Sequence, residues 1–158
     1  MNADSSLVDK KIEELGIQLQ KPVKPVANYV TTVQTGNLVF TSGHGPIGDD
    51  GQLILGQLGT DMDIEGGYQA ARAVGIGLLS TLKATLGNLD RIKKIVKLVG
   101  FVNSSADFKD QPAVVNGASD LFVEIFGDKG RHARSAVGMV QLPGGIPVEV
   151  EVIVEVEG

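Results

Sequence analysis

The sequence predicts an α+β domain with a mixed sheet and helices on one of its faces. Strand patterns come in pairs near the two ends of the chain, at 28–42 and 133–156, and two helical patterns lie between them. A single strand pattern at 92–102 separates the helices, and its dense apolar residues favour a central, buried position. Helices grouped in this way typically pack together on one face of the sheet.

The N-terminal segment predicts a short helix followed by an extended connector. Ser5 or Ser6 can cap a helix over 7–15, and Gly16 can end it. Two prolines within 21–25 prevent a helix from continuing there. We therefore expect residues 1–26 to form an N-terminal helix and connector, and residues 27–158 to form a single domain.

The segments 28–33 and 38–42 are rich in Val and Thr and predict two strands. The turn signal Thr35-Gly36-Asn37 between them indicates a β-hairpin.

Two segments carry apolar residues at helical spacing, 64–86 and 111–126. Gly87 and Gly127 follow their last periodic residues, which is where glycine commonly ends a helix. Pro112 stands in the first turn of the second segment, where proline is well tolerated.

The C-terminal pattern predicts a second pair of strands, joined by the turn residues 142–145. From Val148 to Val156 every even position is valine, which indicates one buried face. We interpret the pair as a hairpin, which places Glu149 opposite Val140 and leaves Arg134 roughly 20 Å away. A site that uses both side chains would then need two chains.

Composition excludes several classes of protein. The 158 residues are 42% hydrophobic, enough for the core of one domain, and contain no cysteine, so disulfides, thiolate metal sites and cysteine nucleophiles are ruled out. A net charge of -5 argues against a nucleic-acid partner. No apolar run reaches the roughly 18 residues of a membrane span, and the N-terminus has no signal-peptide pattern. We expect a cytoplasmic protein without a membrane partner.

Two charged residues are candidates for chemistry, each with a plainer alternative. Arg134 could bind a carboxylate through two hydrogen bonds, or form a surface ion pair. Glu149 could activate a water molecule, or simply face solvent. His44 and His132 are expected to be surface or loop residues, and two isolated histidines do not indicate a metal site. No metal or cofactor is implied.

Several of these segments together resemble a known family. The segments Asn37–Gly43, Ala133–Ser135, Leu142-Pro143 and Val148–Glu151 resemble the Rid family of reactive intermediate deaminases, also called the YjgF-like family. The resemblance covers nearly all of 29–156. It implies a chorismate-mutase-like fold, homotrimers with clefts between subunits, and hydrolysis of 2-imino acids or enamines to 2-keto acids and ammonia.

The resemblance also implies roles for individual residues. Arg134 would hold the carboxylate of a small substrate, Glu149 would activate the attacking water, and Gly43 would offer its backbone near the reacting group. The residues expected to line the cleft beside them are Tyr29, Ser42 and Asn116.

Two departures from the family pattern leave the substrate and the activity open. Ala136 stands where the deaminase branch typically has cysteine, and His44 stands where glutamine is common. A non-catalytic trimer that binds small carboxylates or keto acids is the main alternative. Endoribonuclease activity is a further one, against which the acidic charge argues.

Overall fold

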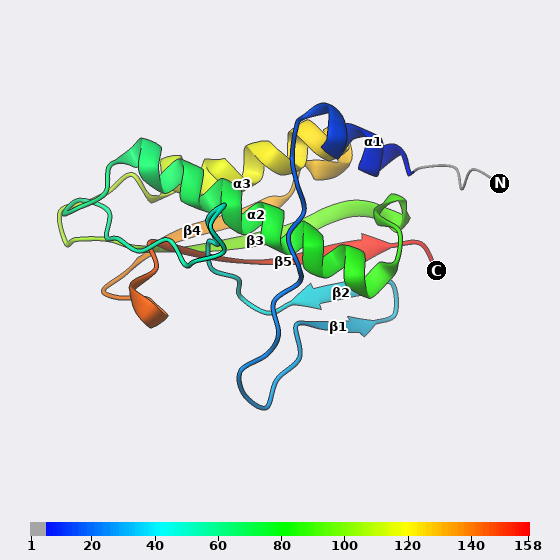
Figure 1. The fold of residues 1–158 in the computed structure, drawn as a ribbon, viewed down its shortest axis with the longest axis horizontal. Coiled ribbons are helices and arrows are strands. Elements are labelled where there is room, and N and C mark those ends of the chain that lie inside the picture. The colour runs from blue at the N-terminus through cyan, green and yellow to red at the C-terminus, as the bar shows by residue number, and fades with distance from the viewer. Residues whose placement is uncertain (1–5) are drawn as a thin grey trace.

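The computed structural model describes residues 6–158 and shows a five-stranded sheet with two long helices on one face (Figure 1). The order of helices and strands is the one the sequence predicts. The helices are α1 (Leu7–Glu14), α2 (Ile64–Leu86) and α3 (Gln111–Phe126), and the strands are β1 (Thr32–Thr35), β2 (Leu38–Thr41), β3 (Ile92–Asn103), β4 (Ala133–Met139) and β5 (Val148–Val156).

The long helices begin and end where the sequence predicts. The Asp63 side chain caps α2 by accepting a hydrogen bond from the Gly66 N–H at 2.8 Å, and Gly87, with φ of 77°, ends that helix. The first hairpin is also confirmed, but β1 begins at Thr32 rather than at Asn28. Residues 28–31 carry strand-forming side chains yet lie outside the paired segment, because β2 ends at Thr41 opposite Thr32.

The predicted C-terminal hairpin is wrong. The strand order is β1-β2-β5-β3-β4, so β3 lies between β4 and β5. β4 pairs with β3 in parallel, and β5 pairs with β3 in antiparallel fashion. Parallel neighbours need a crossover connection, which α3 provides. The turn after β4 therefore crosses the end of β3 instead of folding back on β4.

A buried asparagine at the end of β3 holds this crossing turn. The Asn103 N–H donates to the Pro147 carbonyl at 2.9 Å. Its side-chain amide donates to the Ile146 carbonyl at 3.1 Å and to Gln141 Oε1 at 2.7 Å. Asn103 lies about forty positions before its partners in the turn, which is why turn residues alone do not reveal the strand order.

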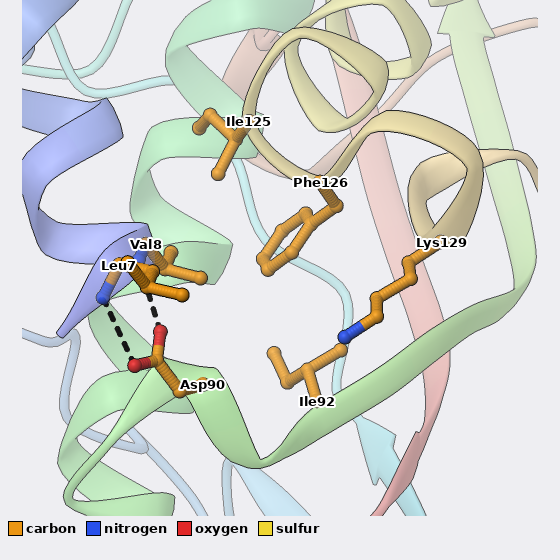
Figure 2. A pocket seen from close by; sticks show the side chains of 7 residues that line it. All are labelled: Leu7, Val8, Asp90, Ile92, Ile125, Phe126 and Lys129. Atoms are coloured by element: carbon orange, nitrogen blue, oxygen red, sulfur yellow. Dashed lines mark hydrogen bonds between the residues drawn. The ribbon is translucent and has the colours of Figure 1, made fainter.

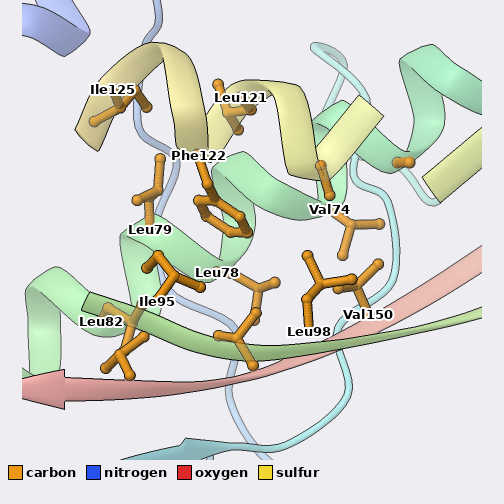
Figure 3. Close-up of a cluster of buried hydrophobic side chains, with 14 of the residues drawn as sticks. Val74, Leu78, Leu79, Leu82, Ile95, Leu98, Leu121, Phe122, Ile125 and Val150 are labelled. Carbon is orange, nitrogen blue, oxygen red and sulfur yellow. The ribbon is translucent and has the colours of Figure 1, made fainter. Parts of the chain in front are cut away.

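The core lies between the sheet and the two long helices (Figure 3). The even-numbered valines of β5 are all buried, as their period of two predicts. The helices pack closely where α3 carries Gly117, because a methyl group there would overlap the carbonyl oxygen of Tyr68 on α2. The core side chains labelled in Figure 3 are Val74, Leu78, Leu79, Leu82, Ile95, Leu98, Leu121, Phe122, Ile125 and Val150.

The N-terminal helix is attached to the rest of the fold by Asp90, which follows α2 (Figure 2). The Asp90 carboxylate accepts hydrogen bonds from the Ser6 hydroxyl and from the N–H groups of Leu7 and Val8, at 2.7–2.9 Å. These are free donors at the start of α1, where a negative charge is favoured. Ser6 caps the same helix, as predicted, and Ile12 is buried in the core.

Replacing Asp90 with asparagine should destabilise the protein by about 1 kcal/mol, because the charged cap of α1 is lost. Burial raises the pKa of Asp90, but the hydrogen bonds from Val8, Ser6 and Leu7 outweigh it and hold the pKa below its usual value. The stabilisation is therefore present above the unfolded-state pKa and is lost as pH falls through the folded-state pKa. Urea unfolding at neutral and acid pH measures both effects. Asp107→Asn, at an exposed position, is the matched control.

Candidate functional site

Glu149 and Gly43 form the centre of one group of candidate residues, on the uncovered face of the sheet. Glu149 points to this face because its neighbours Val148 and Val150 point into the core. Gly43 follows β2, and a methyl group at this position would lie 2.7 Å from Glu149 Oε1. The carboxylate therefore lies directly over the main chain at Gly43, and a side chain at this position would displace it.

The surroundings of Glu149 differ from those of a solvated strand residue. Its side chain is half-buried, and within residues 6–158 it has no cation at ion-pair distance. Burial, and next the negative charge of Glu151, raise the pKa of Glu149. A carboxylate with a raised pKa is a stronger base once ionised, which suits proton removal from water.

Ser42 joins this group through the segment that precedes β1. Its hydroxyl donates to the Val30 carbonyl at 2.6 Å, and its N–H donates to the Thr31 carbonyl at 2.9 Å. Tyr29, which is 48% exposed, comes directly before Val30. The fold thus places Tyr29, Ser42, Gly43 and Glu149 in the same region of the chain's surface.

His44 lies outside the named strands, as a loop residue would, but it is buried rather than at the surface. It is 3% exposed, and its ring lies between two oxygen atoms, with Nδ1 2.8 Å from the Ser42 carbonyl and Nε2 2.8 Å from Thr81 Oγ1. A carbonyl can only accept, so Nδ1 carries the proton, and Nε2 accepts from the Thr81 hydroxyl when the ring is neutral. Burial lowers the pKa of His44. Its position links the Ser42–Gly43 backbone to α2.

Arg134 forms the second group, together with α3. It pairs with buried Leu98, so its side chain lies on the helix side of the sheet, at the β4 edge. Its Nη1 donates to Asn116 Oδ1 at 2.8 Å and to Ser119 Oγ at 3.1 Å. Both hydrogens of Nη1 are then used. Within the described chain Nε and Nη2 have no partner, and that edge of a guanidinium binds a carboxylate with two parallel hydrogen bonds.

The two groups do not meet within one chain, although not for the reason that the hairpin interpretation gave. Arg134 pairs with Leu98, whereas Glu149 pairs with Phe101, three residues further along β3 and on its other side. Their Cα atoms are about 14 Å apart, given about 3.3 Å per residue and about 4.8 Å between strands. Their side chains also point to opposite faces of the sheet.

Sequence reasoning missed Ser119 as a partner of Arg134 and gave His132 no role. Ser119 lies three residues after Asn116, so both occupy the same side of α3. Given Asn116 as a candidate, this helical spacing indicates Ser119 as a second residue on the same side of α3. Ala136, where cysteine is common in the family, packs against the hydrophobic core on the same side of β4 as Arg134.

Other parts of the described chain offer less for chemistry. A cavity of about 270 Å³ lies between α1 and the end of α3 (Figure 2), but it contains none of the candidate residues. No three His, Asp or Glu side chains in residues 6–158 gather as metal ligands would. None of the helices in that range combines the length and apolar content needed to cross a bilayer.

Comparison with known proteins shows the family. A family model described as "YjgF/chorismate_mutase-like, putative endoribonuclease" matches residues 9–153. This chain belongs to the YjgF-like family. The resemblance found in its segments is thereby confirmed, and the α+β fold with it.

Three relatives of this YjgF-like chain illustrate how far the similarity reaches. Protein TCP17 of Trypanosoma cruzi is 46% identical over 152 residues, covering 96% of this chain and 95% of the relative. The crystal structure of Atu1372 from Agrobacterium tumefaciens, a protein of unknown function, is 38% identical with a TM-score of 0.89 and covers 96% and 93% of the two chains. A "putative endoribonuclease" from Shewanella oneidensis is 32% identical with a TM-score of 0.91 and covers 94% and 99%.

Proposed function

We propose that this protein deaminates small 2-imino acids, or their enamine tautomers, in a cleft between the subunits of a homotrimer. One observation carries the proposal: the unpartnered edge of Arg134 and the base-like Glu149 lie on opposite faces of one sheet. The first suits a substrate carboxylate and the second suits an attacking water. A second copy of the chain is the simplest way to bring them together.

The reaction needs only these groups and water. Arg134 of one subunit holds the substrate carboxylate and fixes the position of C2, which supplies much of the catalysis. Glu149 of the next subunit takes a proton from water while the oxygen attacks C2 of the C=N bond. That proton passes to the nitrogen as the C=N π bond opens, which gives a carbinolamine. The C–N bond then breaks while the hydroxyl proton moves through Glu149 to the departing nitrogen, so ammonia leaves as the C=O bond forms. The products are a 2-keto acid and ammonia.

The uncovered face of the sheet supports the assembly. Val33 and Phe40 are exposed and pair across β1 and β2. Val137 is exposed beside Phe101, and Phe101 is also the partner of Glu149. Exposed apolar side chains around a half-buried carboxylate are typical of a surface that another subunit covers.

A turnover assay together with a mass measurement tests the proposal. An amino-acid oxidase generates a small imino acid in place, and the release of ammonia is followed with and without the protein. We expect release faster than the uncatalysed rate, and light scattering should give three times the chain mass of 16.6 kDa. A monomer at micromolar concentration would remove the shared cleft. Carboxylate binding without turnover of any small imine would favour a non-catalytic binder, and cleavage of RNA would favour the endoribonuclease named in the family description.

A further inference from the structure

We propose that His132 is a positioning residue, which acts through Ser119 to orient the Arg134 guanidinium for its ligand. The inference rests on the proposed function for the identity of that ligand, a small carboxylate. It adds a residue beyond those that contact the substrate, and it couples the binding of the ligand to a proton.

The hydrogen bonds of His132 have a fixed direction. Its Nδ1 lies 2.7 Å from the Gly130 carbonyl, which can only accept, so Nδ1 carries a proton. In the neutral ring Nε2 must then accept, and it lies 2.9 Å from Ser119 Oγ. The Ser119 proton points to His132, which leaves a lone pair of Oγ for the Arg134 Nη1 at 3.1 Å.

Packing holds the histidine ring in this position. The His132 ring meets the fully buried Phe122 edge to face, with centroids 6.4 Å apart and an interplanar angle of 89°. The Gly130 carbonyl is also fixed, because Gly130 packs so closely on α3 that a methyl group there would overlap the Phe122 carbonyl. The Gly130 end of the link to Arg134 is therefore anchored in the core.

Arg134 is the charge that acts on His132. Burial lowers the pKa of His132, the hydrogen bond to Gly130 opposes this, and the positive charge of Arg134 lowers the pKa further. Four other charged groups on the surrounding elements have partners of their own: Asp120 with Tyr68, Glu124 with Arg72, Asp128 with Arg131, and Lys97 with Ser135. Lys129, three residues before His132, lies instead at the cavity that α1 and Asp90 line.

Ligand binding and protonation of His132 should therefore favour each other. A carboxylate on Arg134 offsets the positive charge that lowers the pKa of His132, so that pKa rises when the ligand binds. By linkage, the ligand binds more tightly as pH falls through the pKa of His132. Ser119 Oγ can still accept from Arg134 after His132 is protonated, because the oxygen has two lone pairs.

Two substitutions separate orientation from charge, with pyruvate affinity measured by calorimetry at pH 8 and pH 5.5. His132→Phe keeps the ring against Phe122 but removes the acceptor, and it should weaken binding at pH 8 by about three- to tenfold, the worth of one hydrogen bond. His132→Gln keeps an acceptor without a titrating group, so it should retain affinity at pH 8 and lose the tightening at pH 5.5. Arg131→Gln, in which the neighbouring charge is removed, is the control and should bind like the wild type. Equal affinity and equal pH dependence in wild type and His132→Phe would overturn the proposal.

A nuclear magnetic resonance titration tests the link without any ligand. The ¹⁵N shifts of His132 should show a proton on Nδ1 in the neutral ring, and Arg134→Gln should raise the pKa of His132. An unchanged pKa, or a proton on Nε2 in the neutral ring, would disprove the link. If pyruvate does not bind the wild type, the proposed function fails, and this titration alone then decides whether His132 and Arg134 are coupled.

Discussion

Replacing Glu149 with glutamine should leave the fold and the affinity for keto acids intact but lower the rate of imine hydrolysis by at least about tenfold. The amide has nearly the same shape, yet it cannot accept a proton from water, and general-base assistance is worth roughly 10²–10⁴-fold. The lower bound allows for solvent taking over part of the role. Hydrolysis of an imino acid generated in place measures the effect, and pyruvate calorimetry checks that the binding site survives. Equal rates in the two proteins would show that Glu149 is not the base.

Stability and pH give independent checks on Glu149. Since the folded-state pKa of this carboxyl is raised, ionisation costs stability as pH rises through that pKa. Glu149→Gln should therefore be at least as stable as wild type at pH 7. Glu151→Gln should lower the pKa of Glu149 and move the acid limb of the rate profile to lower pH. Glu155→Gln, on the same face of β5 but beside Lys93, is the matched control and should keep the wild-type rate.

Replacing Arg134 with alanine should abolish detectable binding of small 2-keto acids, and lysine should only weaken it. Charge-assisted hydrogen bonds contribute about 1.5–3 kcal/mol each, so the loss of a two-bond fork removes most of the affinity of a small ligand. A lysine keeps the charge but presents a single nitrogen in place of the Nε–Nη2 edge. Calorimetry with pyruvate or 2-ketobutyrate gives the affinities.

Arg131→Ala is the control for this experiment. Arg131 lies three residues earlier and is exposed, and within residues 6–158 its ion-pair partner is Asp128. The Arg131→Ala variant loses one positive charge, as Arg134→Ala does, but it leaves in place the Arg134 guanidinium that Asn116 and Ser119 bind. Equal affinity in wild type and Arg134→Ala would make the arginine a structural residue that ties β4 to α3.

Elements specified by local signals could be predicted from the sequence. The bounds of α2 and α3 follow from the sequence because their apolar spacing and the glycines at their ends are local features. The inner face of β5 followed from its valines. The order of β3, β4 and β5 did not follow, because α3 and Asn103 decide it through contacts distant in sequence.

In the candidate site, too, some features follow from local sequence and others depend on contacts between distant segments. The sequence patterns indicate Arg134 and Glu149 as candidates. The hairpin from which their separation was inferred is wrong, and the position of β3 between their two strands sets that separation instead. What could not be predicted is how each is held. The link from Arg134 through Ser119 to His132 depends on the packing of α3 against β4, and the burial of His44 depends on Thr81 in α2. Neither pair is close in sequence.

The two faces of the sheet also bear on the genetics of this protein. Suppose that each cleft takes Arg134 from one subunit and Glu149 from the next. A chain without Arg134 can then still supply Glu149 to a cleft whose arginine comes from a chain without Glu149. Two defective alleles expressed together would then complement one another. With random mixing of equal amounts, about a quarter of the clefts in a cyclic trimer would receive both intact residues. A cell that carries one allele without Arg134 and one without Glu149 would accordingly keep part of the activity, although each allele alone would give none.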